Sequence, residues 1–199
     1  MALALNDKVL TEAFGPSEGT ALRVKQALMV VLGIVALSIL AKVKIPMWPV
    51  PITMGTFAVL TIGATYGPRL GLATILGYMI IGALGFDVFA SSSAEAYGLT
   101  YMMGGTGGYL VGYVLATLAL GWAARAGWDR SVLMMAFAML LGNVLIYVPG
   151  VAWLGVLYGW DQPILQWGLT PFLIGDALKL ALAALLVPAI WKMVGDARK

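Results

Sequence analysis

Long apolar stretches recur along the 199-residue chain, separated only by short polar, proline-rich or glycine-rich segments. Their approximate bounds are residues 22–41, 52–66, 70–84, 109–123, 132–157 and 171–191. A helix needs about 20 apolar residues to cross a bilayer, and its backbone polar groups must be satisfied within the segment. We therefore expect an all-α integral membrane protein. Residues 22–199 would form one membrane domain, a bundle of six transmembrane helices, after an N-terminal tail at residues 1–21.

The composition agrees with this class and excludes several chemistries. Hydrophobic residues make up 61% of the chain and charged residues 11%, and the mean hydropathy is +0.94, values typical of integral membrane proteins. The sequence has no Cys and no His, which excludes disulfides, thiolate or imidazole metal ligands and Ser-His-Asp catalysis. It has no nucleotide-binding motif. We therefore expect a protein that is not an enzyme, has no ATPase activity, needs no cofactor and binds no nucleic acid.

Two charged residues, Asp176 and Lys179, lie well inside the last apolar stretch. Because they are three residues apart, a helix places both side chains on one face. A charge at that depth costs roughly 2.5 to 3.5 kcal/mol on insertion scales, so charged residues in spans usually mark a functional site. The pair therefore predicts a binding site that faces the bundle interior. The alternative is a structural ion pair that locks the helix to its neighbours.

Other polar and aromatic residues extend the candidate site. Asn143 lies near the middle of the fifth stretch and either binds a ligand or holds two helices together. Residues 86–103 form a polar loop that either gates a bundle opening or serves as a connector. A glycine-rich segment at residues 104–109 lets the backbone turn sharply and approach either a ligand or a neighbouring helix closely. The further candidate binding residues in these segments are Ser92, Thr106, Tyr109, Tyr147 and Trp153.

The basic residues predict the orientation of the bundle. If the N-terminus is cytoplasmic, nine Lys and Arg residues fall on the inner side and only Lys42 and Lys44 on the outer side. Cytoplasmic loops of membrane proteins carry this excess of positive charge. Both termini are therefore expected in the cytoplasm. Asp176 and Lys179 would then lie at the floor of a pocket open to the outside, roofed by residues 86–103.

Such a pocket suits a small amphipathic molecule with a flat apolar part, a hydrogen-bonding head and an anionic end. One cation and one anion are available, with Tyr and Trp side chains as walls. Proton-driven transport is less favoured, because no chain of titratable groups crosses the bilayer. A structural scaffold that binds nothing small remains as an alternative.

Five motifs occur in order from about residue 44 to the C-terminus, and together they resemble the BioY family. They are residues 45–53 (IPMWPVPIT), residues 66–71 (YGPRLG), the glycine-rich residues 104–109 followed by Gly112, a fifth-stretch set (Gly142-Asn143, Ile146-Tyr147, Gly150, Trp153-Leu154), and Pro171-Phe172 with Gly175-Asp176 and Lys179.

The resemblance implies the six-helix substrate-binding component, or S component, of an energy-coupling factor (ECF) transporter in the cytoplasmic membrane. The expected ligand is biotin, with Asp176 and Lys179 contacting its polar groups. The expected partners are a transmembrane coupling subunit and two cytoplasmic ATPases, with a homo-oligomer as a further possibility. Thiamin, riboflavin or lipoate would be the ligand of a related S component.

Overall fold

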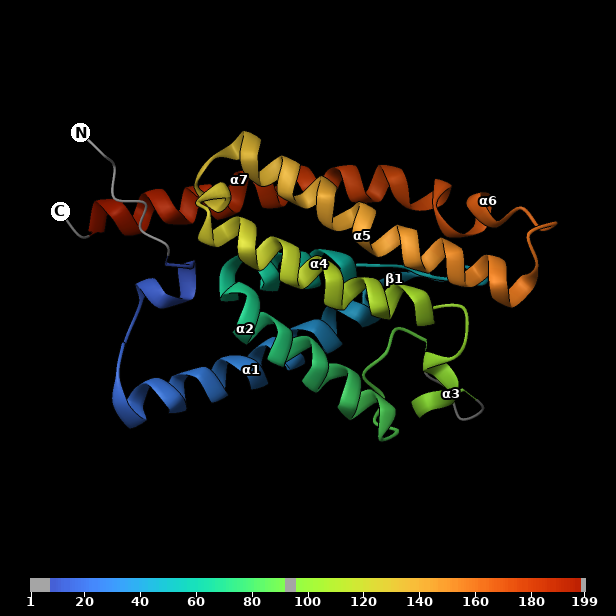
Figure 1. Cartoon of the computed structure of the whole chain (residues 1–199), viewed down its shortest axis with the longest axis horizontal. Helices are drawn as coiled ribbons and strands as arrows, with labels where there is room; N and C mark the ends of the chain where they lie inside the picture. Colours follow the sequence, from blue (N-terminus) through green and yellow to red (C-terminus); the bar gives the residue numbers. More distant parts are fainter. Residues whose placement is uncertain (1–7, 92–95, 198–199) are drawn as a thin grey trace.

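The computed structural model describes residues 8–91 and 96–197, and it is almost entirely helical (Figure 1). In chain order the elements are η1 (Leu10–Ala13), α1 (Gly19–Lys42), β1 (Lys44–Ile45), β2 (Ile52–Thr53), α2 (Gly55–Ala83), α3 (Gly98–Met102), α4 (Gly107–Arg125), η2 (Trp128–Arg130), α5 (Val132–Tyr158), α6 (Ile164–Gly168), η3 (Thr170–Phe172) and α7 (Leu173–Ala197). The expected all-α fold is confirmed. Helix α1 begins three residues before the predicted stretch, and part of the predicted N-terminal tail forms η1.

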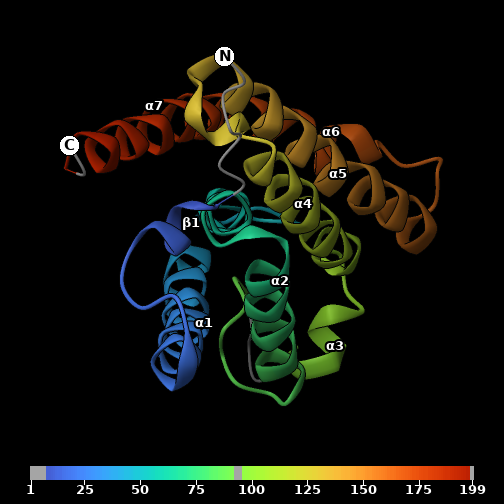
Figure 2. The ribbon, with the colours of Figure 1, turned by 60° about the vertical axis from the view of Figure 1, so that its left-hand side comes forward.

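The long helices run along the long axis of the molecule (Figure 1). Figure 2 shows α1 and α2 on one side of α4, and α5 and α7 on the other. Helices α3 and α6 lie at one end of the bundle, called here the α6 end. At the opposite end, the η1 end, Leu10 and Ala13 pack with Val194 of α7. The beginning and the end of the described chain therefore meet at the η1 end.

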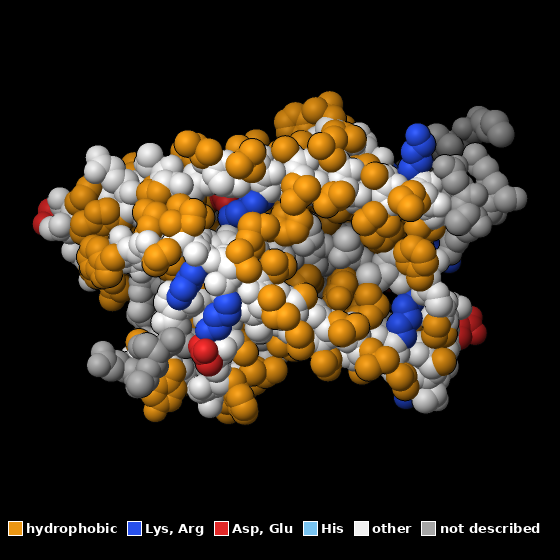
Figure 3. Space-filling model, turned by 180° about the vertical axis from the view of Figure 1, so that it is seen from behind, with side chains coloured by type: hydrophobic (Ala, Val, Ile, Leu, Met, Phe, Trp, Pro, Cys, Tyr) orange, Lys and Arg blue, Asp and Glu red, His pale blue; other side chains and the backbone are white. Residues whose placement is uncertain are grey.

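In the described part of the chain, residues 8–91 and 96–197, four helical segments are long and apolar enough to cross a membrane: Gly19–Lys42, Gly107–Arg125, Val132–Tyr158 and Ile164–Gly195. Many large hydrophobic side chains on these helices are exposed, such as Leu32, Val148 and Leu178. Hydrophobic side chains dominate the face seen in Figure 3, and basic side chains occur there only in small groups. An exposed apolar surface of this extent fits a lipid environment. The chain is a multi-pass membrane protein.

The turn expected at residues 67–69 is present in α2, but only Gly67 departs from helical geometry. Gly67 has φ +77°, a value that favours glycine, and Pro68 follows it. A Cβ atom on Gly71 would lie 3.6 Å from the Gly63 Cα, so the chain reverses direction at Gly67. The predicted second and third helices, residues 52–66 and 70–84, thus appear as two arms of α2 on either side of this break.

Packed connectors close the α6 end. Strands β1 and β2 pair antiparallel, and between them the Trp48 ring lies 5.3 Å from Tyr158 and 5.0 Å from Trp167. The segment after α2 was expected to be a polar loop, but its Phe89 is fully buried and stacks on Tyr101 at 4.7 Å. These contacts fix the connector positions around the opening between the helices.

Candidate binding site

Asp176 and Lys179 lie in the first two turns of α7, near the α6 end, and both are buried. Their i, i+3 spacing brings Lys179 Nζ to 2.8 Å from Asp176 Oδ1. Lys179 Nζ also donates to the Thr53 carbonyl oxygen at 2.7 Å and to Thr56 Oγ1 at 3.0 Å. The predicted pair is therefore an ion pair that is also bonded to the start of α2.

The remaining carboxylate oxygen of the pair is bonded across the bundle. The Tyr147 hydroxyl of α5 donates to Asp176 Oδ2, and Thr56 Oγ1 lies 3.5 Å from Asp176 Oδ1. A buried ion pair is tolerated when its remaining hydrogen-bonding positions are also satisfied. The pair carries no net charge and joins α2, α5 and α7 at one point.

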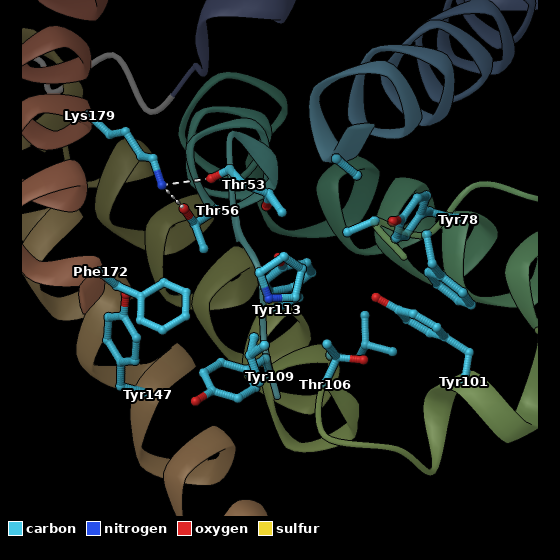
Figure 4. A pocket seen from close by; sticks show the side chains of 16 residues that line it. Thr53, Thr56, Tyr78, Tyr101, Thr106, Tyr109, Tyr113, Tyr147, Phe172 and Lys179 are labelled. Carbon is cyan, nitrogen blue, oxygen red and sulfur yellow. Dashed lines mark hydrogen bonds between the residues drawn. The ribbon is translucent and has the colours of Figure 1, made fainter. Parts of the chain in front are cut away.

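A cavity lies directly beside this pair. It contains about 560 Å³ of space that no protein atom fills, part of it open to solvent. In Figure 4, Lys179 lies at one side of the cavity and Tyr78 and Tyr101 at the other, with Tyr109 and Tyr113 between them. The lining residues are Ala41, Val50, Pro51, Thr53, Thr56, Tyr78, Phe89, Ala90, Tyr101, Thr106, Tyr109, Leu110, Tyr113, Tyr147, Phe172 and Lys179.

Four of the residues predicted from the sequence line this cavity: Thr106, Tyr109, Tyr147 and Lys179. Asp176 lies behind them, bonded to both Tyr147 and Lys179. The cavity therefore contacts the ion pair in two ways: directly at the Lys179 side chain, and through Tyr147, whose hydroxyl is bonded to Asp176.

The other predicted residues do not line the cavity. Asn143 lies in a separate groove between α5 and α7, on the far side of Tyr147 and Asp176. Trp153 Nε1 donates to the Gly104 carbonyl oxygen at 2.8 Å, so this side chain holds the glycine-rich segment in place. Ser92 lies outside the described residues.

The glycine-rich segment brings α4 against α5. A Cβ atom on Gly108 would lie 2.3 Å from the Pro149 carbonyl oxygen, so only glycine fits at this position. The close approach places Tyr109 beside the cavity, where its hydroxyl donates to the Gly168 carbonyl oxygen at 2.7 Å. The glycines therefore position one wall of the cavity. From the sequence we expected only that this segment approaches a ligand or a helix closely.

Several lining residues were not singled out from the sequence. Thr53 and Thr56 bind Lys179, and Tyr113 follows Tyr109 by one helical turn. The i, i+4 spacing of two tyrosines on an otherwise apolar helix is the one signal that could have found Tyr113. Tyr78 and Tyr101 enter the cavity from α2 and α3, and nothing in their local sequence predicts that they meet.

Aromatic rings and hydroxyl groups dominate the chemistry of the cavity. Burial raises the pKa of the Tyr101 hydroxyl, although its hydrogen bond with Thr106 acts in the opposite direction. This hydroxyl is therefore protonated at neutral pH and can both donate and accept. Among the described residues, no group of three or more Asp or Glu side chains could hold a metal ion. The cavity fits a small, partly flat organic molecule with hydrogen-bonding groups.

Comparison with known proteins agrees with this chemistry. The BioY family model matches residues 14–196. The chain is 33% identical to the probable biotin transporter BioY of Pyrococcus horikoshii over 165 residues, which cover 83% of this chain and 95% of that protein. It is 30% identical to the biotin transporter BioY of Thermotoga maritima over 164 residues, covering 77% and 88% of the two chains.

The fold is also similar to a solved structure. The crystal structure of the S-component for biotin from an ECF-type ABC transporter superposes with a TM-score of 0.73 at 20% sequence identity. The match covers 88% of this chain and 95% of that one. The helical fold, the ordered motifs and the match to the family model over residues 14–196 lead to one conclusion: the chain belongs to the BioY family.

Proposed function

We propose that this protein captures biotin at the outer face of the cytoplasmic membrane, as the substrate-binding component of an ECF transporter. The observation that carries the proposal is the aromatic cavity beside the buried Asp176–Lys179 pair. The biotin transporters among its relatives support the choice of ligand. Biotin combines a compact fused ring, a hydrogen-bonding ureido group and a carboxylate, which matches the mixture of rings, hydroxyls and charge in the cavity.

The ureido ring of biotin is placed at the Asp176–Lys179 side of the cavity. The ammonium charge of Lys179 is already neutralised by Asp176 at 2.8 Å, so this side offers hydrogen bonds without net charge. A second carboxylate there would lie close to Asp176 in a poorly solvated site, which is unfavourable. A neutral ureido group can instead exchange hydrogen bonds with the Tyr147 hydroxyl and Thr56, and with Lys179 where it replaces one of the present acceptors of that ammonium group. The carboxylate then points toward the connectors at the α6 end.

A cation near those connectors supports this placement. Lys44 Nζ donates to the carbonyl oxygen of Ala90, a cavity-lining residue, and lies 3.3 Å from Ser91 Oγ. Among the described residues Lys44 has no carboxylate partner. Its charge is therefore available to attract the anionic end of the ligand.

Energy for transport is assigned to partner subunits. The sequence contains no phosphate-binding loop, since no Lys-Ser or Lys-Thr follows its glycine-rich segment. Uptake would then depend on a transmembrane coupling subunit and two cytoplasmic ATPases, as in the ECF arrangement. A structural similarity to an S-component of an ECF-type transporter supports this assignment.

Biotin binding by the purified protein tests the proposal. The detergent-solubilised protein should give a simple saturable isotherm with biotin, and thiamin, riboflavin or lipoate in excess should not compete. The single variants Asp176→Asn and Lys179→Met should each weaken binding by at least about 30-fold, because one group of a buried, hydrogen-bonded pair loses its partner. Titration calorimetry measures both effects.

Controls separate loss of the site from loss of the fold. Lys192→Met makes the same change at an exposed position of α7 far from the cavity, and binding should persist. The double variant Asp176→Asn/Lys179→Met leaves no unpaired buried charge, so it should remain monodisperse and still fail to bind. Normal affinity in this double variant would overturn the site assignment, and competition by another vitamin would overturn the ligand.

A further inference from the structure

A second hollow lies at the η1 end, away from the candidate biotin cavity. It contains about 890 Å³ of space that no protein atom fills, part of it open to solvent. Helix α1, the second arm of α2, η1 and the end of α4 surround it. Its lining residues are Thr11, Glu12, Leu22, Lys25, Gln26, Met29, Tyr66, Arg69, Leu70, Ala73 and Arg125.

Two helices present matching faces to this hollow. Helix α1 contributes residues 22, 25, 26 and 29, and α2 contributes residues 66, 69, 70 and 73. Residues 22, 25, 26 and 29 have the i, i+3, i+4, i+7 spacing of one helix face, and residues 69, 70 and 73 lie on one face of the second arm of α2, while Tyr66 precedes the break at Gly67. Both segments run away from the η1 end, so Lys25 and Arg69 lie near the end of the bundle and Met29 and Ala73 lie deeper. The hollow is therefore basic at its mouth and apolar further into the membrane region.

The basic charge of the hollow is only partly compensated. Arg125 forms an ion pair with Glu12 at 2.7 Å, which neutralises both. Lys25 donates to the Phe14 carbonyl oxygen, which leaves its charge unbalanced. Within residues 8–91 and 96–197, the guanidinium of Arg69 forms no hydrogen bond or ion pair, and the residue is exposed. Among these residues, Lys25 and Arg69 are thus two positive charges at the mouth without a carboxylate partner, and the Gln26 amide and the Tyr66 hydroxyl are further hydrogen-bond donors.

The surroundings of the hollow indicate where its ligand comes from. Helix α1 is the least buried of the four candidate spans. Val24, Leu28 and Val31, on the face of α1 turned away from the hollow, are each more than half exposed. This face forms a surface for lipid, so the helix that makes one wall of the hollow is itself in contact with the membrane. A soluble anion would not need the apolar wall at Met29 and Ala73.

We infer that this hollow binds the headgroup of an anionic phospholipid. Its phosphate would lie between Lys25 and Arg69, where ammonium and guanidinium groups form charge-assisted hydrogen bonds, and an acyl chain would follow Met29 and Ala73. Basic pockets between transmembrane helices on the cytoplasmic side are suited to anionic lipid headgroups. The assignment uses the orientation that places the η1 end in the cytoplasm, and it does not depend on which ligand fills the other cavity.

Lipid retention by the full-length protein tests this site. The purified protein would be mixed with micelles that contain equal amounts of phosphatidylglycerol and phosphatidylcholine with the same acyl chains, and native mass spectrometry would count the bound lipids. The wild type should retain phosphatidylglycerol in preference. Lys25→Gln and Arg69→Gln should each lower that preference about fivefold, since each removes one positive charge near a phosphate.

Matched variants keep the result interpretable. Arg23→Gln removes the same charge from an exposed position of α1 that does not line the hollow, and it should leave the preference unchanged. Arg69→Lys should restore most of it. Each variant must also remain monodisperse and keep the wild-type Tm in detergent, which shows that it is folded whether or not biotin is the ligand of the other cavity.

Three outcomes would overturn the inference. An unchanged lipid preference in both Lys25→Gln and Arg69→Gln would exclude the hollow as a lipid site. Complete displacement of phosphatidylglycerol by millimolar glycerol 3-phosphate would identify a soluble phosphate compound as the ligand. Loss of a co-expressed coupling subunit from these variants, with lipid preference intact, would identify the hollow as a protein contact.

Discussion

At the scale of single residues, Lys179 illustrates how a charge can be held within an apolar helix. Its ammonium group has three hydrogens, and three protein oxygens accept them, from Asp176, Thr53 and Thr56. An ammonium group that is paired and fully hydrogen-bonded avoids most of the cost of burial. The pair therefore joins helices, as one of the two alternatives expected, and it also lies beside a cavity, while its role in ligand binding stays a proposal.

This geometry predicts which part of biotin dominates binding. Biotinamide, in which a neutral amide replaces the carboxylate, should bind within about fivefold of biotin, because an exposed ion pair with Lys44 contributes at most about 1 kcal/mol. 2-Iminobiotin, in which a protonated guanidinium replaces the neutral ureido group, should bind at least about tenfold more weakly, since it loses the acceptor oxygen and brings a second positive charge beside Lys179. Competition calorimetry compares the two analogues. The reverse order would place the carboxylate at Lys179.

At the scale of helices, close packing depends on glycines of α4. A Cβ atom on Gly112 would lie 2.6 Å from the Ile146 Cα of α5, and one on Gly121 would lie 2.4 Å from the Pro68 nitrogen of α2. Both contacts are with backbone, which cannot rotate away. Small residues of this kind let transmembrane helices approach closely. Helix α4 is therefore held between α5 and α2 at a distance that no larger residue permits.

Gly112→Ala should accordingly destabilise the bundle. An inserted methyl group that forces backbones apart costs about 1 to 3 kcal/mol, which corresponds to a fall of roughly 2 to 12 °C in Tm. Gly175→Ala serves as the control, because its nearest neighbour is a side-chain carbon at 3.9 Å and alanine favours the helix. Thermal unfolding in detergent measures both. An equal Tm for the two variants would contradict the close-packing account.

At the scale of the whole molecule, the charge distribution and the fold agree. Arg69 and Arg125 line the hollow at the η1 end. Lys42 and Lys44 lie at the opposite end, where they bond to Asp87 and Ala90 of the connector after α2. Residues predicted from the sequence to lie on opposite sides of the membrane therefore lie at opposite ends of the bundle. From the positive-inside rule we therefore expect the η1 end to face the cytoplasm.

Cysteine labelling tests this orientation cleanly, because the chain contains no Cys. A membrane-impermeant maleimide should label Asp161→Cys, in the exposed connector at the α6 end, in intact cells. Ala126→Cys, exposed after α4 at the η1 end, should react only after the cells are permeabilised. Labelling of Ala126→Cys alone in intact cells would reverse the assignment of inside and outside.

The sequence by itself determined the helical membrane architecture and the pairing of Asp176 with Lys179. Both follow from local rules: an apolar stretch in lipid must be helical, and residues three apart share a helix face. Only the tertiary structure decided which side chains surround the cavity. Lys179 meets the Thr53 carbonyl oxygen across 126 residues of sequence, while Asn143 and Trp153 of the neighbouring helix α5 miss the cavity. The reason is that helix crossings and glycine contacts set which faces converge, and no local pattern in the sequence encodes them.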